Sequence, residues 1–273
     1  MQSLTVPHSG KRAFSVPAPV PGSGAEWARQ GTVVDVQNLT FSYKRTPVLL
    51  RVSFNVYPGD FVAMIGPNGS GKSTLCRVLR GIVPTPAAAR VEVGGEPAGS
   101  APALRMTCYT ADNDHVPRFL SAQEYVRFLA RLHSAPGRRI RFDPAAVDSL
   151  FATLGMGGRT RELMSGYSHG MVKKTQLAAA LLVSRPVTVV DETMNGIDIE
   201  AQYRIEGMLR DYCAAGGAVI MCSHDFSMLQ RCANRVIMLD EGYIVEDAYT
   251  ESLARQSTSI EALVTSYLGV GGG

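Results

Sequence analysis

The stretch GPNGSGKST at residues 66–74 constrains the fold more than any other part of the sequence. It fits the pattern G-x-x-x-x-G-K-[ST], which in proteins follows a buried strand and opens a helix. The apolar run FVAMI at 61–65 precedes it, and the helical pattern KSTLCRVLRG at 72–81 follows it, with Gly81 as the expected C-terminal cap. A glycine-rich turn that matches by chance is the alternative. The flanking strand and helix argue against that alternative.

This loop has the chemistry of a phosphate cradle. Its glycines allow backbone N–H groups to turn towards an anion, and a helix N-terminus already favours negative charge. Lys72 would reach the β- and γ-phosphates of a nucleotide and is also a candidate catalytic residue, whereas the Ser73 hydroxyl would ligate Mg²⁺. We therefore expect ATP and Mg²⁺ as cofactors. The loop residues predicted to bind nucleotide are Gly66, Pro67, Asn68, Gly69, Ser70, Gly71, Lys72, Ser73 and Thr74.

The pattern along the rest of the chain predicts an α/β fold. Continuously apolar strand patterns at 187–192 and 218–224 alternate with helical patterns at 173–183 and 198–216. Such alternation is typical of a parallel sheet that is covered on both faces. Two helical patterns between 121 and 170, with Ser121 and Asp143 as expected N-caps, have no strong strand between them and predict a helical insertion. 

Composition narrows the class of protein only slightly. The net charge of +3 is small for 273 residues, and the one basic cluster, at 138–141, predicts a solvated edge, with nucleic acid or lipid contact as the alternative. Five cysteines without C-x-x-C spacing predict reduced, packed thiols. The sequence has no apolar run of the roughly 18–20 residues that cross a bilayer. We expect residues 1–31 to form a flexible leader and 251–273 a C-terminal helix with a loose tail.

The strand pattern VTVVDE at 187–192 ends in two acidic residues that suit nucleotide hydrolysis. A hydrolytic phosphate-binding loop needs an acid near Mg²⁺ and a group that orients or deprotonates water, at the carboxyl end of a neighbouring strand. Asp191 would hold the metal, and Glu192 would act as the general base. By itself such a pair would be an ordinary strand end that meets solvent. Its combination with the 66–74 loop favours the catalytic interpretation.

The acid pair is followed by TMNGID at 193–198 and VIMCSHD at 219–225. These stretches resemble the ATP-binding cassette (ABC) ATPases, and the resemblance extends over about residues 33–265. The resemblance implies a P-loop NTPase fold with a RecA-like parallel sheet core, an antiparallel β subdomain and an inserted α-helical subdomain. It places the ATPase domain at 32–250 and the helical subdomain at about 112–170.

The family has a signature loop that binds the γ-phosphate held by a second subunit. The stretch YSHGM at 167–171 matches it, because Ser168 has the family's usual separation from Asp191. Ser168 and Gly170 are therefore the candidate nucleotide-binding residues, although the flanking residues depart from the common Leu-Ser-Gly-Gly-Gln and are similar to exporter-type variants. MSG at 164–166 offers an alternative register, with a longer separation from Asp191.

The resemblance assigns three further residues. His224 matches the switch histidine that contacts the γ-phosphate and is a candidate catalytic residue, although a histidine at a strand end is often structural. Asp198 matches the loop that crosses between subunits, and its position also suits a helix N-cap. Tyr43 matches the aromatic residue that stacks on adenine, with a core strand residue as the alternative.

Two positions depart from the family pattern. In CYTADNDHV at 108–116, the alignment of Tyr109 places Asp112 where the family has a Mg²⁺-contacting Gln, with Asn113 as the neighbouring option. A carboxylate can ligate Mg²⁺ but would repel the γ-phosphate whenever the metal is absent. The second departure is Thr193, which replaces the usual Pro after the acid pair and is expected to loosen that loop.

The resemblance implies that two ATPase subunits pair head to tail, each ATP lying between the Lys72 loop of one and the Ser168 loop of the other. The second subunit would be another copy or a homologous ATPase. A separate transmembrane permease subunit would dock beside 109–125 and hold the chain at the cytoplasmic face of the membrane. The signature variant and the terminal pattern TSIEALVTSYL favour export, and no nucleic acid partner is expected.

Two other functions compete with transport. Soluble cassettes that act in DNA repair or on ribosomes usually carry long coiled coils, zinc-binding insertions or two cassettes in one chain, and the sequence has no sign of these. A nucleotide-responsive regulator that barely hydrolyses ATP is the other alternative. The presence of Glu192 argues against such a regulator, whereas Asp112 is compatible with it.

Overall fold

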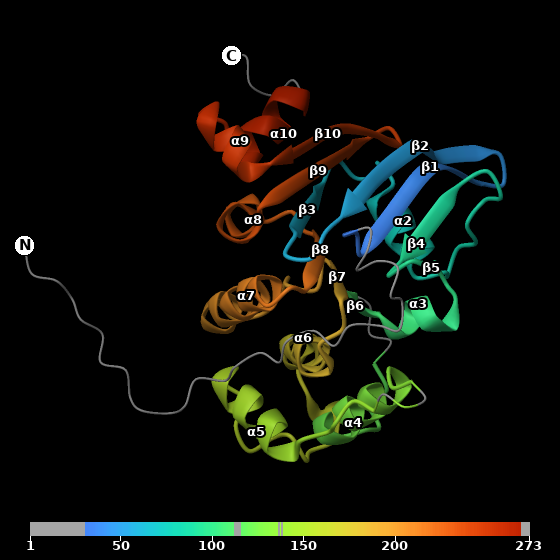
Figure 1. Cartoon of the computed structure of the whole chain (residues 1–273). Coiled ribbons are helices and arrows are strands. Elements are labelled where there is room, and N and C mark those ends of the chain that lie inside the picture. The colour runs from blue at the N-terminus through green and yellow to red at the C-terminus, as the bar shows by residue number, and fades with distance from the viewer. Residues whose placement is uncertain (1–30, 112–115, 136, 138, 269–273) are drawn as a thin grey trace, which may run out of the picture.

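A computed structural model describes residues 31–111, 116–135, 137 and 139–268 of the chain (Figure 1). Asp112 and Asn113, residues 1–30 of the expected leader and residues 269–273 of the expected tail therefore lie outside the described residues.

The centre of the molecule is a six-stranded sheet with the order β10-β9-β3-β8-β7-β6. The strands from β9 to β6 pair in parallel, and β10 pairs antiparallel with β9 at one edge. This arrangement agrees with the parallel sheet expected from the apolar strand patterns. The strands are β3 (Phe61–Ile65), β6 (Thr107–Ala111), β7 (Val187–Asp191), β8 (Ala218–Cys222), β9 (Arg235–Asp240) and β10 (Tyr243–Tyr249).

A second, antiparallel sheet has the order β2-β1-β4-β5 and packs over α2 (Figure 1). The helix α2 lies between the two sheets, because its apolar residues share one core cluster with residues of both sheets. The elements are β1 (Val34–Tyr43), β2 (Thr46–Val56), β4 (Arg90–Val93), β5 (Glu96–Pro97) and α2 (Lys72–Leu79).

Strand β3 contributes to the cores on both faces of the central sheet. Successive side chains of a strand point to opposite faces. Phe61, Ala63 and Ile65 accordingly belong to one core cluster, with helices α6 to α8, and Val62 and Met64 belong to the other, with α2. The whole strand is buried, which holds the following 66–74 loop in a fixed place. The helices on the first face are α6 (His169–Val183), α7 (Ile199–Ala214) and α8 (Phe226–Cys232).

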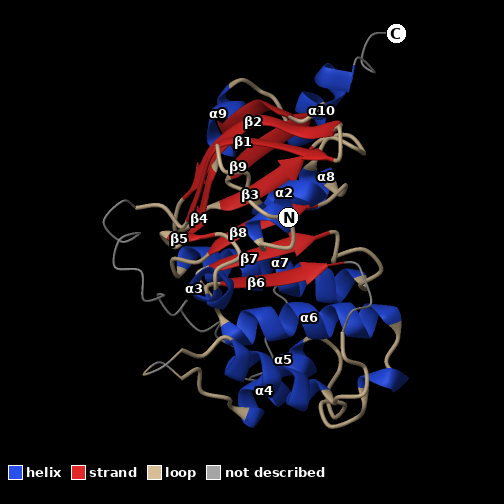
Figure 2. Ribbon diagram, turned by 90° about the vertical axis from the view of Figure 1, so that its right-hand side faces the viewer, coloured by secondary structure: helices blue, strands red, loops and turns tan. Residues whose placement is uncertain are grey.

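A helical segment lies beyond α6, on the side away from the central sheet (Figure 2). It contains α4 (Ala122–Leu132), α5 (Pro144–Thr153) and the short 3-10 helix η1 (Met164–Gly166). Ser121 caps α4 in a capping box with Glu124, and Asp143 caps α5, as the sequence predicts. The remaining helices are α3 (Ala101–Arg105), α9 (Thr250–Arg255) and α10 (Ile260–Leu268).

Within 251–273, the described residues include the helix α10, which packs near α8. The five cysteines are free and buried, as the sequence predicts. Within the described residues, every helix is too short or too polar to traverse a lipid bilayer.

Candidate nucleotide-binding site

The 66–74 loop connects β3 to α2 and has a backbone that requires glycine. Gly66 has a φ of 143° and Gly71 a φ of 108°, values that other residues rarely adopt. A Cβ on Gly66 would lie 2.0 Å from the Leu239 carbonyl oxygen, and one on Gly71 would lie 2.7 Å from Leu49 Cδ2. The loop therefore packs directly against the core, and a side chain at either position would displace it.

Lys72 is buried inside the curve of this loop. Its Nζ donates to the carbonyl oxygens of Gly66, at 2.7 Å, and Pro67, at 2.9 Å. Burial lowers the pKa of the ammonium group, whereas nearby groups that include Glu192 and Asp191 raise it. The Lys72 charge thus lies at the loop, in the electrostatic field of the acid pair.

The loop chemistry fits a phosphate group. The Ser70 hydroxyl is buried and has no hydrogen-bond partner among the described residues. A buried hydroxyl without a partner is costly unless a ligand or water satisfies it. Together with the helix N-terminus and the Lys72 ammonium, this hydroxyl gives the loop donors suited to an anion.

Asp191 ends β7 and is held by a residue of the neighbouring strand. Its Oδ2 accepts a hydrogen bond of 2.8 Å from the Tyr109 hydroxyl on β6. Burial raises the pKa of the Asp191 carboxyl, against the lowering effect of that hydrogen bond and of the Arg77 and Lys72 charges. The oxygen atoms of Asp191 and Ser73 are the hard ligands that Mg²⁺ prefers, so the residues present fit this metal.

Glu192 adopts a left-handed backbone conformation, with a φ of 55°. Its N–H donates to the Cys222 carbonyl oxygen at 3.0 Å, and its Oε1 lies 3.3 Å from His224 Nε2. A non-glycine residue with such a φ is strained, and residues of this kind gather at functional sites. The turn after β7 therefore brings the predicted base and the predicted switch histidine together.

Thr193 corrects one expectation of the sequence. Its side chain is fully buried, and its hydroxyl donates to Thr110 Oγ1 on β6 at 3.1 Å. The replacement of the usual Pro was expected to loosen the loop after the acid pair. The structure shows instead that a buried hydrogen bond ties this loop to the neighbouring strand.

The signature residues lie at the start of α6, where Ser168 is the N-cap and accepts from the Met171 N–H. A Cβ on Gly170 would lie 2.6 Å from the Gly196 carbonyl oxygen, so this helix end packs closely on the loop before α7. The alternative segment 164–166 forms η1 and does not cap α6. The structure therefore places Ser168, and not the 164–166 segment, at the N-terminus of α6.

Two lysines of α6 strengthen the contact with the same loop. Lys173 Nζ donates to the Asn195 carbonyl oxygen at 2.6 Å, and Lys174 forms an ion pair with Asp198. Asp198 also accepts from the Ala201 N–H at 3.0 Å, which confirms it as the N-cap of α7. The hydrogen bond from Lys174 lowers the pKa of Asp198.

The predicted site residues thus form two groups. The 66–74 loop, Asp191, Glu192 and His224 meet at the carboxyl ends of the central strands. In the part of the chain that the structure describes, Ser168, Gly170 and Asp198 have their contacts around the start of α6 and α7. 

Tyr43 lies at the end of β1 with 40% of its surface exposed. Its hydroxyl accepts from Arg77 at 3.4 Å, and this hydrogen bond lowers the Tyr43 pKa. Phe41 contacts its ring edge-on, with the centroids 4.9 Å apart. The exposure argues against the alternative of a core strand residue and agrees with a ring that can stack on a base.

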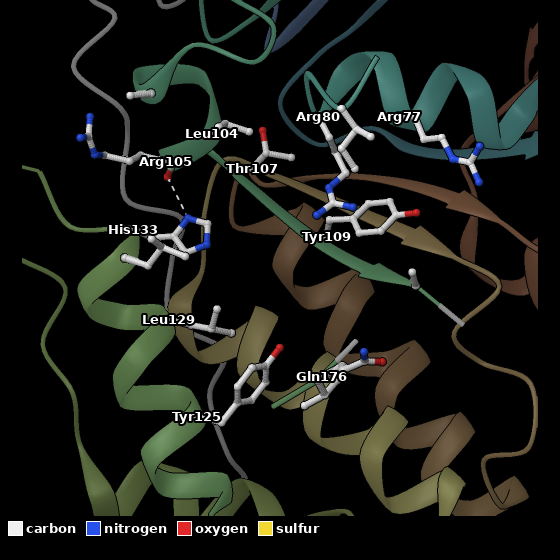
Figure 3. A pocket seen from close by; sticks show the side chains of 15 residues that line it. Arg77, Arg80, Leu104, Arg105, Thr107, Tyr109, Tyr125, Leu129, His133 and Gln176 are labelled. Carbon is white, nitrogen blue, oxygen red and sulfur yellow. Dashed lines mark hydrogen bonds between the residues drawn. The ribbon is translucent and has the colours of Figure 1, made fainter. Parts of the chain in front are cut away.

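A cavity of about 720 Å³ opens between α2, β6 and α4 (Figure 3). Arg77, Arg80 and Tyr109 line one side, and Tyr125 and Leu129 of α4 line the other. The exposed apolar side chains Ile82, Leu104 and Leu132 also contribute to the lining. We call this cavity the α2–α4 groove.

Comparison with known proteins identifies the family. A family model described as "ABC transporter" matches residues 49–195, which is more than half of the chain. The chain belongs to the ABC transporter family. This finding confirms the family expected from the sequence motifs, a family that binds and hydrolyses ATP to power transport.

Individual proteins that are similar in sequence carry names from the same family. An uncharacterized ABC transporter ATP-binding protein of Nostoc sp. is 29% identical over 209 residues, which are 76% of this chain and 61% of that protein. The Nod factor export ATP-binding protein I of Rhizobium meliloti is 26% identical over 252 residues, 92% of this chain and 72% of that protein. The chain therefore spans less than two thirds of the Nostoc protein.

Solved structures confirm the expected P-loop NTPase fold. The structure of an ATP-binding subunit of an ABC transporter superposes with a TM-score of 0.76 at 22% identity, covering 85% of this chain and 98% of that chain. The expected membership of the ABC transporter family is confirmed by the family model. The comparisons give no support to the alternative of a cassette that acts on DNA or ribosomes.

Sequence reasoning missed three features of the site. These are the Tyr109–Asp191 hydrogen bond, the left-handed Glu192 and the contacts of Lys173 and Lys174. The lysines begin two residues after the signature stretch, so their position was visible in the sequence, but their partners were not.

Proposed function

We propose that the chain is the ATP-hydrolysing subunit of an exporter, with Glu192 as the general base. The observation that supports this most is the 3.3 Å distance between Glu192 Oε1 and His224 Nε2, in the electrostatic vicinity of Lys72 and Asp191. A carboxylate oriented by a histidine beside a phosphate-binding loop has the arrangement that attack of water on a phosphoryl group requires.

The chain's own residues would divide the chemistry among them. The Lys72 ammonium would exchange its contacts with the Gly66 and Pro67 carbonyls for phosphate oxygens. Glu192 would accept the proton of the attacking water, and His224 would hold that carboxylate and contact the γ-phosphate. Mg²⁺, when bound, would neutralise charge on the phosphates. Ser73 and Asp191 would hold it, and Asp112 stays a further candidate ligand.

The signature group would complete the site of a second subunit. Ser168 is exposed at the N-terminus of α6, where backbone N–H groups and the helix dipole favour an anion. Together with Gly170 and Asp198 it would face ATP bound on the 66–74 loop of a paired copy or a homologous ATPase. A head-to-tail pair is the arrangement that supplies both groups to each ATP.

The α2–α4 groove would receive the transmembrane permease subunit. Its lining combines exposed apolar residues with arginine side chains, which suits an amphipathic helix that projects from a membrane protein. The similarity to a Nod factor export ATP-binding protein supports export as the direction. The chain would then be held peripherally at the cytoplasmic face of the membrane.

One purification tests this function. The tagged chain is isolated from its native cells in mild detergent, and its companions are identified by mass spectrometry while released phosphate is measured with ATP and Mg²⁺. We expect a polytopic membrane protein and Mg²⁺-dependent ATP hydrolysis. Recovery of ribosomes or nucleic acid in place of a membrane protein would contradict the transporter role, and ATP binding without hydrolysis would favour the regulator.

A further inference from the structure

Tyr109 physically connects the α2–α4 groove to the candidate metal site. Its ring lines the groove (Figure 3), and its hydroxyl donates to Asp191 Oδ2 at 2.8 Å. The guanidinium carbon of Arg80 lies 3.7 Å from the centre of the same ring. The Tyr109 side chain thus presents its ring to the groove and donates a hydrogen bond to Asp191 through its hydroxyl.

Several contacts fix the position of this side chain. The Arg80 guanidinium covers the ring, and β6 is held in register with β7 through five paired residues from Thr107 to Ala111. 

We propose that Tyr109 is a positioning residue that orients the Asp191 carboxylate for the metal. The inference rests on the proposed function, in which Asp191 holds Mg²⁺. The hydrogen bond from Tyr109 engages Oδ2 and restricts rotation of the carboxylate. A carboxylate that is already oriented loses less conformational freedom when a ligand binds.

A purely structural role for Tyr109 makes a different prediction. In that case the hydroxyl only satisfies a buried oxygen, and its removal lowers the stability of the fold without changing how nucleotide binding depends on Mg²⁺. The Mg²⁺ dependence of nucleotide binding therefore distinguishes the two roles, whereas total activity does not.

The experiment measures equilibrium binding of a fluorescent ATP analogue to the full chain while Mg²⁺ is titrated. The test variant is Tyr109→Phe, which removes the hydroxyl and keeps the ring beneath Arg80. The matched control is Tyr125→Phe, because Tyr125 lines the same groove from α4. We expect Tyr109→Phe to raise the Mg²⁺ concentration that gives half of the maximal increase in analogue binding by about tenfold. A change of this size corresponds to the loss of a hydrogen bond to a charged group. Binding in EDTA should stay unchanged, and Tyr125→Phe should match the wild type.

A second variant keeps the proposal testable if Tyr109→Phe folds poorly. Arg80→Gln retains the hydroxyl and removes the cation above the ring, so we expect a shift in the same direction by about two- to threefold. Wild-type Mg²⁺ dependence in both variants would overturn the role of Tyr109 while leaving the proposed function intact. A wild-type chain that binds the analogue without any dependence on Mg²⁺ would overturn the metal site itself.

Discussion

His224 Nε2 lies 3.3 Å from Glu192 Oε1, although the two residues follow different strands, β8 and β7. The left-handed turn at Glu192, with a φ of 55°, and its hydrogen bond to the Cys222 carbonyl produce this approach. Backbone strain of this kind persists only where surrounding contacts enforce it. The fold itself therefore positions the proposed base beside His224.

Glu192→Gln should nearly abolish hydrolysis and leave ATP binding intact, because an amide cannot accept the proton of the attacking water. We expect a loss of at least about 100-fold in turnover, the lower range for a positioned general base. Phosphate release and analogue binding measure the two quantities. The variant should also accumulate as an ATP-bound dimer in size-exclusion chromatography with light scattering. Unchanged phosphate release would refute the assignment of the base.

Lys72→Ala should weaken nucleotide binding by at least about tenfold, because it removes a charge-assisted hydrogen bond from the phosphate site. Isothermal titration calorimetry with ATP and Mg²⁺ gives the dissociation constant. The measurement should accompany a thermal unfolding curve, since Lys72 also bonds to the Gly66 and Pro67 carbonyls. Wild-type affinity in a folded variant would argue against the phosphate cradle.

Gly170→Ala should impair hydrolysis, because its Cβ would lie 2.6 Å from the Gly196 carbonyl oxygen and displace the signature loop. Gly166→Ala is the matched control, since a Cβ there has no heavy atom within 4 Å. We expect at least a tenfold loss of turnover in the first variant, with ATP affinity of the single chain retained, and little change in the second. The opposite result would support the alternative register at 164–166.

Thr193→Val should destabilise the fold by about 1–2 kcal/mol, because it leaves the buried Thr110 hydroxyl without its partner. Replacement of both residues in Thr110→Val/Thr193→Val should recover part of this loss, because no unpaired hydroxyl then remains. Urea unfolding of the wild type, the two single variants and the double variant measures the coupling free energy between the two residues. Additive effects of the two replacements would show that the hydrogen bond does not tether the loop.

His133 should make stability depend on pH. Burial lowers its pKa from 6.5 to about 4, and the Arg185 charge adds to the decrease, against the raising effect of a hydrogen bond with the Arg105 carbonyl. The unfolded chain therefore binds a proton at a higher pH than the folded chain. The stabilising contribution is complete above pH 6.5 and is lost as the pH falls towards 4, by about 2–3 kcal/mol.

Urea unfolding between pH 7 and pH 4 tests the role of His133. The wild-type chain should lose more stability over this range than His133→Gln, which carries no titrating group at this position. Parallel curves for the wild type and His133→Gln would exclude His133 as the source.

The sequence predicted those parts of the fold that depend on local patterns. The buried run at 61–65, the glycine spacing at 66–71 and the N-caps Ser121 and Asp143 each act over a few residues, and each is where it was expected. The family resemblance then supplied the expected roles of residues far apart in the chain. Its P-loop NTPase fold is confirmed by the solved structures.

The features that were missed depend on strand register and on long-range packing. Tyr109 and Asp191 are 82 residues apart, and only the parallel pairing of β6 with β7 places them together. The expectation that Thr193 loosens its loop did not foresee the buried hydrogen bond from its hydroxyl to Thr110 on β6. A single sequence contains no direct record of such pairings.

The close packing of Gly170 on the Gly196 carbonyl, supported by the Lys174–Asp198 ion pair, has a consequence for pairing between subunits. This packing holds Ser168 and Asp198 at a fixed spacing. If subunits pair as proposed, we expect the partner's surface to match that spacing, so a contact within one chain would help to determine which chains can pair.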